Sequence, residues 1–138
     1  MVVAVSGGFD PLHIGHVRHF KGAKQIGNYL LVFLQTDDWL MKKKGYVFMP
    51  YAERKEILES IKWVDQVVRV IDEDTTVAKT LAEYKPDIFL KGGDRTLNNI
   101  PDSEKNSCKK HGIRLVYDNM GGKIQSSSWL IEKVRKCK

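Results

Sequence analysis

The sequence predicts a single α/β domain in which helices cover both faces of a mainly parallel sheet of about five strands. Short, continuous apolar runs alternate with segments of helical periodicity along the chain, which is the pattern of repeated strand–helix–strand units. The chain has 138 residues, of which 42% are hydrophobic and 29% charged, a balance typical of one globular domain. We therefore assign residues 1–138 to one domain.

The strands are expected where the apolar runs are continuous, because a parallel strand between two layers of helices is buried on both faces. They fall at residues 2–6, 29–34, 66–71, 87–90 and 113–117. Helical spacing of apolar residues, or an opening proline, predicts helices at residues 14–25, 50–64, 75–84, 102–111 and 126–136. Residues 42–49 are polar and irregular and are predicted to form a loop. This order describes a Rossmann-like, doubly wound domain.

Glycine pairs follow two of the predicted strands. Gly7 and Gly8 come after the first strand, and Gly92 and Gly93 come after the fourth, within Lys91-Gly92-Gly93-Asp94. The carboxyl ends of parallel strands meet at one rim of the sheet, which is where ligands bind in such folds. The sequence therefore predicts one site built from both pairs.

Composition restricts the classes of partner and compartment. The net charge of +6 favours anionic partners. The lysines and arginines are dispersed, however, which argues against a nucleic-acid partner. Cys108 and Cys137 form no CxxC pair, so two reduced thiols are expected rather than a disulfide or a metal site. The N-terminus lacks the features of a signal peptide and no apolar run has the length of a membrane span, so we expect a cytoplasmic protein without a membrane partner.

The strongest chemical signal lies in residues 7–16, Gly-Gly-Phe-Asp-Pro-Leu-His-Ile-Gly-His. His13 and His16 are three residues apart at the start of a predicted helix, so both imidazoles should share one face. The helix N-terminus and the bare glycine backbone offer N–H groups to a phosphate. A structural or surface role is the alternative for either histidine alone, but the combination predicts a phosphate site. Neither a GxGxxG nor a P-loop motif is present.

This segment resembles the His-x-Gly-His signature of the cytidylyltransferase-like nucleotidyltransferases. Ser126-Ser127-Ser128 resembles that family's Ser/Thr-rich turn, which holds the triphosphate, with a plain helix N-cap as the alternative. Residues 86–94 are similar to the nucleotidyltransferase domain of ADP-heptose synthases, and residues 42–58 are similar to glycerol-3-phosphate cytidylyltransferases. The resemblance extends over nearly the whole chain.

The resemblance implies transfer of a nucleoside monophosphate, AMP from ATP in the leading interpretation, onto a phosphorylated sugar such as heptose 1-phosphate. Pyrophosphate is released and Mg²⁺ is the expected cofactor, with no fixed protein ligand, although Asp10 is the nearest carboxylate. His13, His16, Lys44 and Arg54 are the candidate catalytic residues. For Arg54 the alternative is a solvated helix surface, and for Lys42 and Lys43 a solvated charge run is favoured. The nucleotide-binding candidates are Gly7, Gly8, Phe9, Asp10, Gly15, Lys91, Gly92, Gly93, Asp94, Ser126, Ser127 and Ser128.

Other functions share the same phosphate site. They are CTP-dependent transfer onto glycerol 3-phosphate or a related alcohol phosphate, adenylyl transfer onto a flavin mononucleotide, a regulatory nucleotide sensor, and a basic nucleic-acid-binding module without catalysis. The chain also departs from the cytidylyltransferases, because no Arg precedes Ser126 and Lys123 is the nearby cation. Trp129 either belongs to the core or borders the substrate. By analogy with similar enzymes we expect a homodimer.

Overall fold

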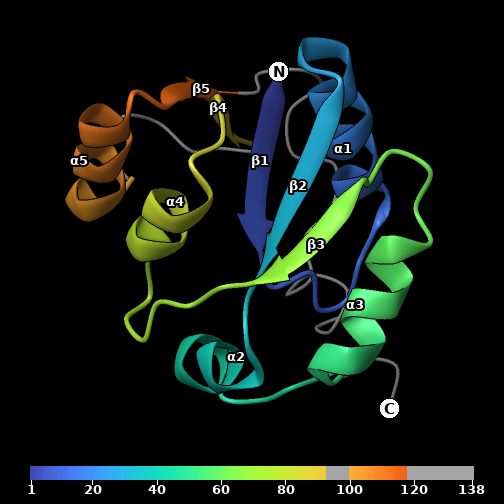
Figure 1. Cartoon of the computed structure of the whole chain (residues 1–138). Helices are drawn as coiled ribbons and strands as arrows, with labels where there is room; N and C mark the ends of the chain where they lie inside the picture. The colour runs from blue at the N-terminus through green and yellow to red at the C-terminus, as the bar shows by residue number, and fades with distance from the viewer. Residues whose placement is uncertain (93–99, 118–138) are drawn as a thin grey trace.

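The protein, seen in a computed structural model that describes residues 1–92 and 100–117, is built on a sheet of five parallel strands (Figure 1). The strands are β1 (Val2–Gly7), β2 (Tyr29–Leu34), β3 (Gln66–Arg69), β4 (Ile88–Lys91) and β5 (Arg114–Tyr117). Their order is β3-β2-β1-β4-β5, so the direction of winding reverses at β1. The carboxyl ends of β1 and β4 therefore flank the switch point at which such sheets bind ligands.

Helices cover both faces of this sheet, which confirms the predicted α/β class. They are α1 (Ile14–Ile26), α2 (Asp37–Lys44), α3 (Tyr51–Glu59), α4 (Ala78–Tyr84) and α5 (Asp102–His111). Phe20 of α1 and Leu58 of α3 pack with Val5 on one face, whereas Leu81 of α4 and Cys108 of α5 pack on the other. Figure 1 shows α4 and α5 on one side of the strands, α1 and α3 on the other, and α2 below the arrowheads. The rim at the carboxyl ends is thus left to loops and α2.

The predicted loop at residues 42–49 is wrong in its first part, because residues 42–44 form the last turn of α2. Thr36 caps this helix by accepting a hydrogen bond from the Trp39 amide at 3.1 Å. Acidic residues occupy its first turn and three lysines its last, which matches the helix dipole. Gly45 then ends it in a left-handed conformation with φ 81°.

Other predicted boundaries also shift. The helix that follows Pro50 ends at Glu59, although Ile61 and Val64 still pack against the core. The helix expected from residue 75 begins at Ala78, because Asp74 accepts hydrogen bonds from the amide and the hydroxyl of Thr76 in a local turn. The helix predicted at residues 126–136 lies outside the described residues, as does Cys137. In the described parts of the chain, no helix combines the length and apolar character needed to cross a membrane.

Candidate active site

The two predicted phosphate-binding histidines lie against each other at the start of α1. The His13 side chain is the N-cap, and its Nδ1 accepts a hydrogen bond from the Gly15 amide at 3.1 Å. The His13 amide in turn donates to Nδ1 of His16 at 3.2 Å. The imidazole rings stack with centroids 3.8 Å apart. The three-residue spacing therefore places both rings on one face, as the sequence predicts.

These hydrogen bonds determine which nitrogen carries the proton. Because Nδ1 of each ring accepts a backbone N–H, each neutral imidazole holds its proton on Nε2. Burial, followed by the neighbouring charges of His13, His19 and Lys44, lowers the pKa of His16 to about 3. At neutral pH His16 is therefore an uncharged hydrogen-bond donor.

Phe9 forms the wall behind His16. Its ring meets the His16 ring edge-on at a centroid distance of 5.0 Å and the Phe20 ring at 5.4 Å. Phe9 adopts a positive φ of 50°, which is uncommon outside glycine and marks a local constraint next to the candidate site. A Cβ on Gly7 would lie 3.0 Å from the Phe9 ring, so a glycine there lets that ring fold back over the strand end.

Asp10 fixes the turn that carries these groups. Its buried carboxylate accepts hydrogen bonds from the amides of Phe48 at 2.7 Å and Met49 at 2.6 Å. The Lys44 ammonium donates to the Asp10 carbonyl oxygen at 3.2 Å, and burial lowers the pKa of Lys44. These bonds connect the segment after α2 to the turn before α1. They also hold Lys44 beside the turn that carries the two histidines.

Arg54 binds the backbone of the segments that surround this turn. The side chain is fully buried, so the alternative of a solvated helix surface is wrong. Its guanidinium donates to three carbonyl oxygens and to one carboxylate, namely Met49 O at 2.9 Å, Gly8 O and Gln35 O at 2.8 Å, and Asp37 Oδ1 at 2.6 Å. These bonds use four of the five guanidinium N–H groups, so Arg54 holds together the backbone on which the site is built. The expected phosphate contact stays a prediction.

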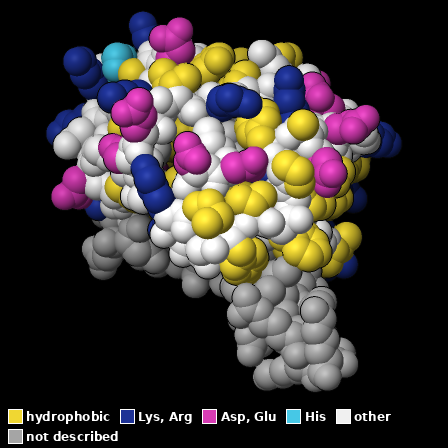
Figure 2. All heavy atoms as spheres, turned by 90° about the horizontal axis from the view of Figure 1, so that it is seen from below, with side chains coloured by type: hydrophobic (Ala, Val, Ile, Leu, Met, Phe, Trp, Pro, Cys, Tyr) yellow, Lys and Arg dark blue, Asp and Glu magenta, His cyan; other side chains and the backbone are white. Residues whose placement is uncertain are grey.

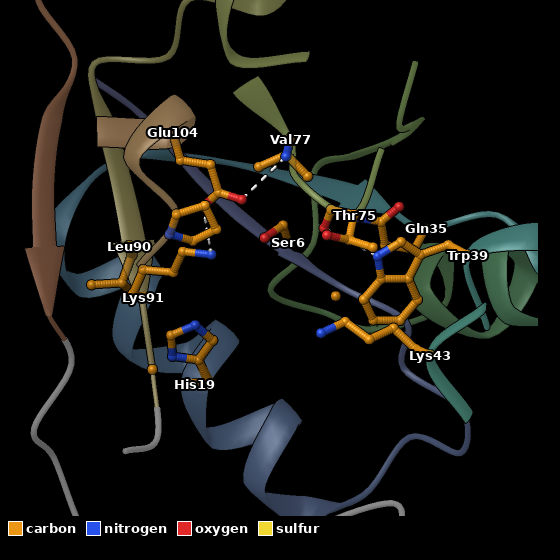
Figure 3. Close-up of a pocket in the computed structure, with 13 residues that line it drawn as sticks. Ser6, His19, Gln35, Trp39, Lys43, Thr75, Val77, Leu90, Lys91 and Glu104 are labelled. Atoms are coloured by element: carbon orange, nitrogen blue, oxygen red, sulfur yellow. Dashed lines mark hydrogen bonds and ion pairs between the residues drawn. The ribbon is translucent and has the colours of Figure 1, made fainter. Parts of the chain in front are cut away.

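A pocket of about 180 Å³ opens at the carboxyl ends of β1 and β4 (Figure 3). Neither His13 nor His16 is among the residues that line it. Its lining includes both Gly7 and Gly92, so the predicted meeting of the two glycine segments at one rim is found in the fold. A Cβ on Gly92 would lie 2.7 Å from the His19 ring, which explains the need for glycine at this wall. Figure 3 shows Lys91, Glu104 and His19 on one wall and Trp39, Lys43 and Thr75 on the other.

Most lining residues of this pocket were missed by sequence reasoning, among them His19, Trp39 and Glu104. His19 lies one helical turn after His16, a spacing that could have signalled it. Trp39 and Glu104 come from α2 and α5, and only the three-dimensional fold brings them to β1 and β4. Lys91 was expected among the nucleotide-binding residues, and in the structure its side-chain ammonium lies 3.1 Å from Glu104 Oε1. Gly93, Asp94, Lys123, Ser126, Ser127, Ser128 and Trp129 lie outside the described residues.

The described side chains do not build a metal site. In residues 1–92 and 100–117, no group of three or more His, Cys, Asp or Glu side chains is arranged to hold a metal ion. Both oxygens of Asp10, the nearest carboxylate to the histidines in sequence, already accept backbone hydrogen bonds. The donor set therefore does not fit a cation held by protein ligands alone.

Comparison with known proteins agrees with this geometry. Residues 4–135 match the profile of the family described as Cytidylyltransferase-like. The chain is 34% identical over 135 residues to the bifunctional protein HldE of Citrifermentans bemidjiense, which covers 96% of this chain but 27% of the relative's length. It is 35% identical over 92 residues to glycerol-3-phosphate cytidylyltransferase of Bacillus subtilis, covering 67% of this chain and 70% of that protein.

A solved structure gives the same result for the fold. The lipopolysaccharide core biosynthesis protein from Thermoplasma volcanium superimposes with a TM-score of 0.72 at 28% sequence identity, covering 85% of this chain and 94% of that one. The family match spans nearly the whole chain and includes the histidine pair, the buried arginine and both glycine segments. The chain therefore belongs to the cytidylyltransferase-like family of nucleotidyltransferases.

Proposed function

We propose that this chain transfers AMP from ATP onto a phosphorylated sugar such as heptose 1-phosphate, with release of pyrophosphate. The observation that carries the proposal is the stacked pair His13 and His16, whose Nδ1 atoms are both occupied by backbone N–H groups. Two Nε2–H donors beside a helix N-terminus suit the oxygens of a triphosphate. The resemblance of residues 86–94 to ADP-heptose synthases favours the sugar phosphate and ATP, and the similarity to HldE covers 96% of this chain.

In the proposed step, an oxygen of the acceptor phosphate attacks the α-phosphorus of ATP in line with the leaving group. The new P–O bond forms as the bond between the α-phosphorus and the bridging α–β oxygen breaks, and the electron pair leaves with pyrophosphate. No protein nucleophile is needed, so positioning and charge stabilisation provide the catalysis. His13 and His16 donate hydrogen bonds to the phosphate oxygens on which charge builds up, and Lys44 adds a cation beside them.

The neutral state of His16 matters for this role. A donor that is already uncharged loses no proton to the departing pyrophosphate and keeps its hydrogen bond throughout the reaction. Mg²⁺ remains part of the proposal as a companion of ATP, held by phosphate oxygens, since the described side chains do not form a site for it. A homodimer and a cytoplasmic location remain predictions.

Cytidylyl transfer onto glycerol 3-phosphate is the second candidate, because the similarity to the Bacillus subtilis enzyme covers 70% of that protein. A nucleic-acid-binding role has less support. Figure 2 shows the face below the carboxyl ends of the strands, where basic, acidic and hydrophobic side chains are interspersed and form no continuous basic stripe. A nucleic-acid footprint is expected to cluster its lysines and arginines.

Pyrophosphate release measures the donor and the acceptor together. We would combine ATP, CTP, GTP or UTP with heptose 1-phosphate or glycerol 3-phosphate, in the presence of Mg²⁺. The proposal expects turnover with ATP and heptose 1-phosphate. Turnover with CTP and glycerol 3-phosphate alone would favour the second candidate, and pyrophosphate release with no pair would overturn transferase activity on these acceptors.

The hydrogen-bond role of His16 is tested by two substitutions of similar polarity. In His16→Gln the side-chain amide can place an N–H near the position of Nε2, whereas the shorter side chain of His16→Asn cannot. Loss of one donor to the transition state lowers kcat by about 10²–10³-fold, so we expect His16→Asn to lose this much and His16→Gln clearly less. His111→Gln, at the far end of α5, is the matched control and should retain wild-type turnover. Equal activity in all three variants would refute the role.

A further inference from the structure

An ion pair is buried in one wall of the pocket. The Lys91 ammonium lies 3.1 Å from Glu104 Oε1, and the two side chains are 12% and 4% exposed. The other carboxylate oxygen of Glu104 accepts a hydrogen bond from the Val77 amide at 3.1 Å. Within the described ranges, Oε1 receives no hydrogen bond of good geometry, so its negative charge depends on Lys91 for compensation. The pair thereby fixes the lysine at the carboxyl end of β4.

Stability alone is a weak reason for this pair. Removing two charges from water costs several kcal/mol per ion, and apolar replacements of buried pairs are often neutral or stabilising. The interior next to the pair is apolar, with Leu90 and Val77 among the lining residues. A buried ion pair on the wall of a polar pocket is better explained by what the pocket binds.

The opposite wall carries a second cation. Lys43 extends from the last turn of α2, and Figure 3 shows its Nζ directed into the space that Lys91 borders from the other side, with Ser6 between the two walls. Lys43 and Lys91 outnumber the single carboxylate of Glu104 in the lining of this cavity, which leaves an excess positive charge that a phosphate would neutralise. A nucleobase, which is uncharged, gains much less from this arrangement.

We propose that Lys91, held in place by Glu104, binds the phosphate of the acceptor and makes the pocket selective for phosphorylated acceptors. This inference rests on the proposed function, because it assigns the acceptor to the pocket and the nucleoside triphosphate to the histidine pair. The acceptor phosphate must approach a triphosphate that is also negative. A cation on the acceptor side reduces that repulsion and raises the occupancy of the attacking group.

Two variants separate substrate binding from a structural role. Lys91→Met removes the ammonium and keeps the length of the side chain, but it leaves the Glu104 charge unpaired. The double variant Lys91→Met/Glu104→Gln removes both charges and so relieves that defect. For a charge-assisted hydrogen bond worth about 1.5–3 kcal/mol, both variants should raise the KM for heptose 1-phosphate by about 10–100-fold. The KM for ATP should change less than about twofold.

The outcomes are read against Lys109→Met, an exposed lysine of the same helix as Glu104, which should leave both KM values unchanged. Recovery of the wild-type acceptor KM in the double variant would show that Lys91 only balances Glu104, and the proposal would fall. A raised KM for ATP with an unchanged KM for the acceptor would equally overturn it, because the pocket would then serve the nucleotide.

A binding measurement tests the pocket even if no transferase activity is found. The Trp39 indole N–H donates to the Thr75 carbonyl oxygen at 3.2 Å on the pocket wall, so its NMR signal reports on this cavity. The signal can be assigned with Trp39→Phe. We expect inorganic phosphate to shift it in the wild type, and the double variant to bind phosphate about tenfold more weakly. An indole signal that phosphate does not move, or moves equally in both proteins, would overturn the inference whatever the activity assays show.

Discussion

The histidine side, which carries His13 and His16, and the pocket side, which carries Lys91, present their functional groups in opposite ways. On the histidine side, backbone hydrogen bonds to Nδ1 set the orientation of both the His13 ring and the His16 ring. On the pocket side, Lys91 is a charged group whose position is set by one carboxylate. The two histidines offer directional hydrogen bonds in a fixed geometry, while Lys91 offers charge. This difference fits a triphosphate that must be held in line for reaction and an acceptor that must be attracted towards it.

The largest expected effect comes from removing the support beneath the histidine side. Arg54→Met would leave the carbonyl oxygens of Gly8, Gln35 and Met49 without their donor in a buried region. Loss of a buried charged partner typically lowers the free energy of unfolding by about 3–5 kcal/mol. We expect a shift of that size in urea denaturation, with an unchanged slope.

Arg114→Met provides the control, because Arg114 is exposed on β5 and should change the free energy of unfolding by less than about 0.5 kcal/mol. A stable Arg54→Met protein with a greatly raised KM for ATP would contradict the supporting role. It would point back to the direct phosphate contact that the sequence motif predicts.

Lowering the pH tests the neutral state of His16. Its pKa is about 3 in the folded protein, below the ordinary histidine value of 6.5. The unfolded chain therefore binds the additional proton between these two values, and folding stability falls as the pH falls from about 6.5 towards 3. The slope for one group is at most about 1.4 kcal/mol per pH unit.

The contribution of His16 is isolated by subtracting the same denaturation series measured on His16→Gln. Above about pH 6.5 the difference between the two proteins should be constant, and below it the wild type should lose stability faster. If the difference in stability between the two proteins does not vary between pH 6.5 and 4.5, His16 takes up its proton as readily in the folded state as in the unfolded state. The contrast between a neutral His16 and a charged Lys91 would then not hold.

The smallest expected effect lies on the pocket side. Trp39→Phe removes the indole hydrogen bond to Thr75 while keeping an aromatic ring on the wall. One such bond contributes about 0.5–1.5 kcal/mol, so urea denaturation should show a loss in this range. A loss as large as that of Arg54→Met would show that this wall is as tightly held as the histidine side.

The sequence predicts the parts of this molecule that depend on short-range patterns. The apolar runs locate all five strands, and the spacing of His13 and His16 determines that their rings share a face. The glycine pairs correctly predict that β1 and β4 end at one site. In each case the relevant information lies within one element or in the rule that parallel strands share a rim.

Long-range effects explain what the sequence does not predict. An arginine is usually exposed, so the sequence suggests a surface position for Arg54. Its complete burial depends on four hydrogen-bond partners from other parts of the chain. Residues 42–44 were predicted to form a loop because three lysines provide no apolar stripe. The Thr36 cap and the acidic first turn are the signals that could have indicated the helix. Glu104 is far from Lys91 in the sequence, and no local pattern connects them.

The His13 side chain caps α1, and in the proposed reaction the same side chain also donates a hydrogen bond to the triphosphate. Mutations that abolish chemistry usually leave a folded protein behind, which is how inactive descendants of enzymes persist. Here, replacing His13 would also weaken the start of the helix that carries His16 and His19. Replacement of Lys44, by contrast, leaves the caps of α1 and α2 in place. An inactive but well-folded descendant of this chain is therefore expected to arise more readily by loss of Lys44 than by loss of His13.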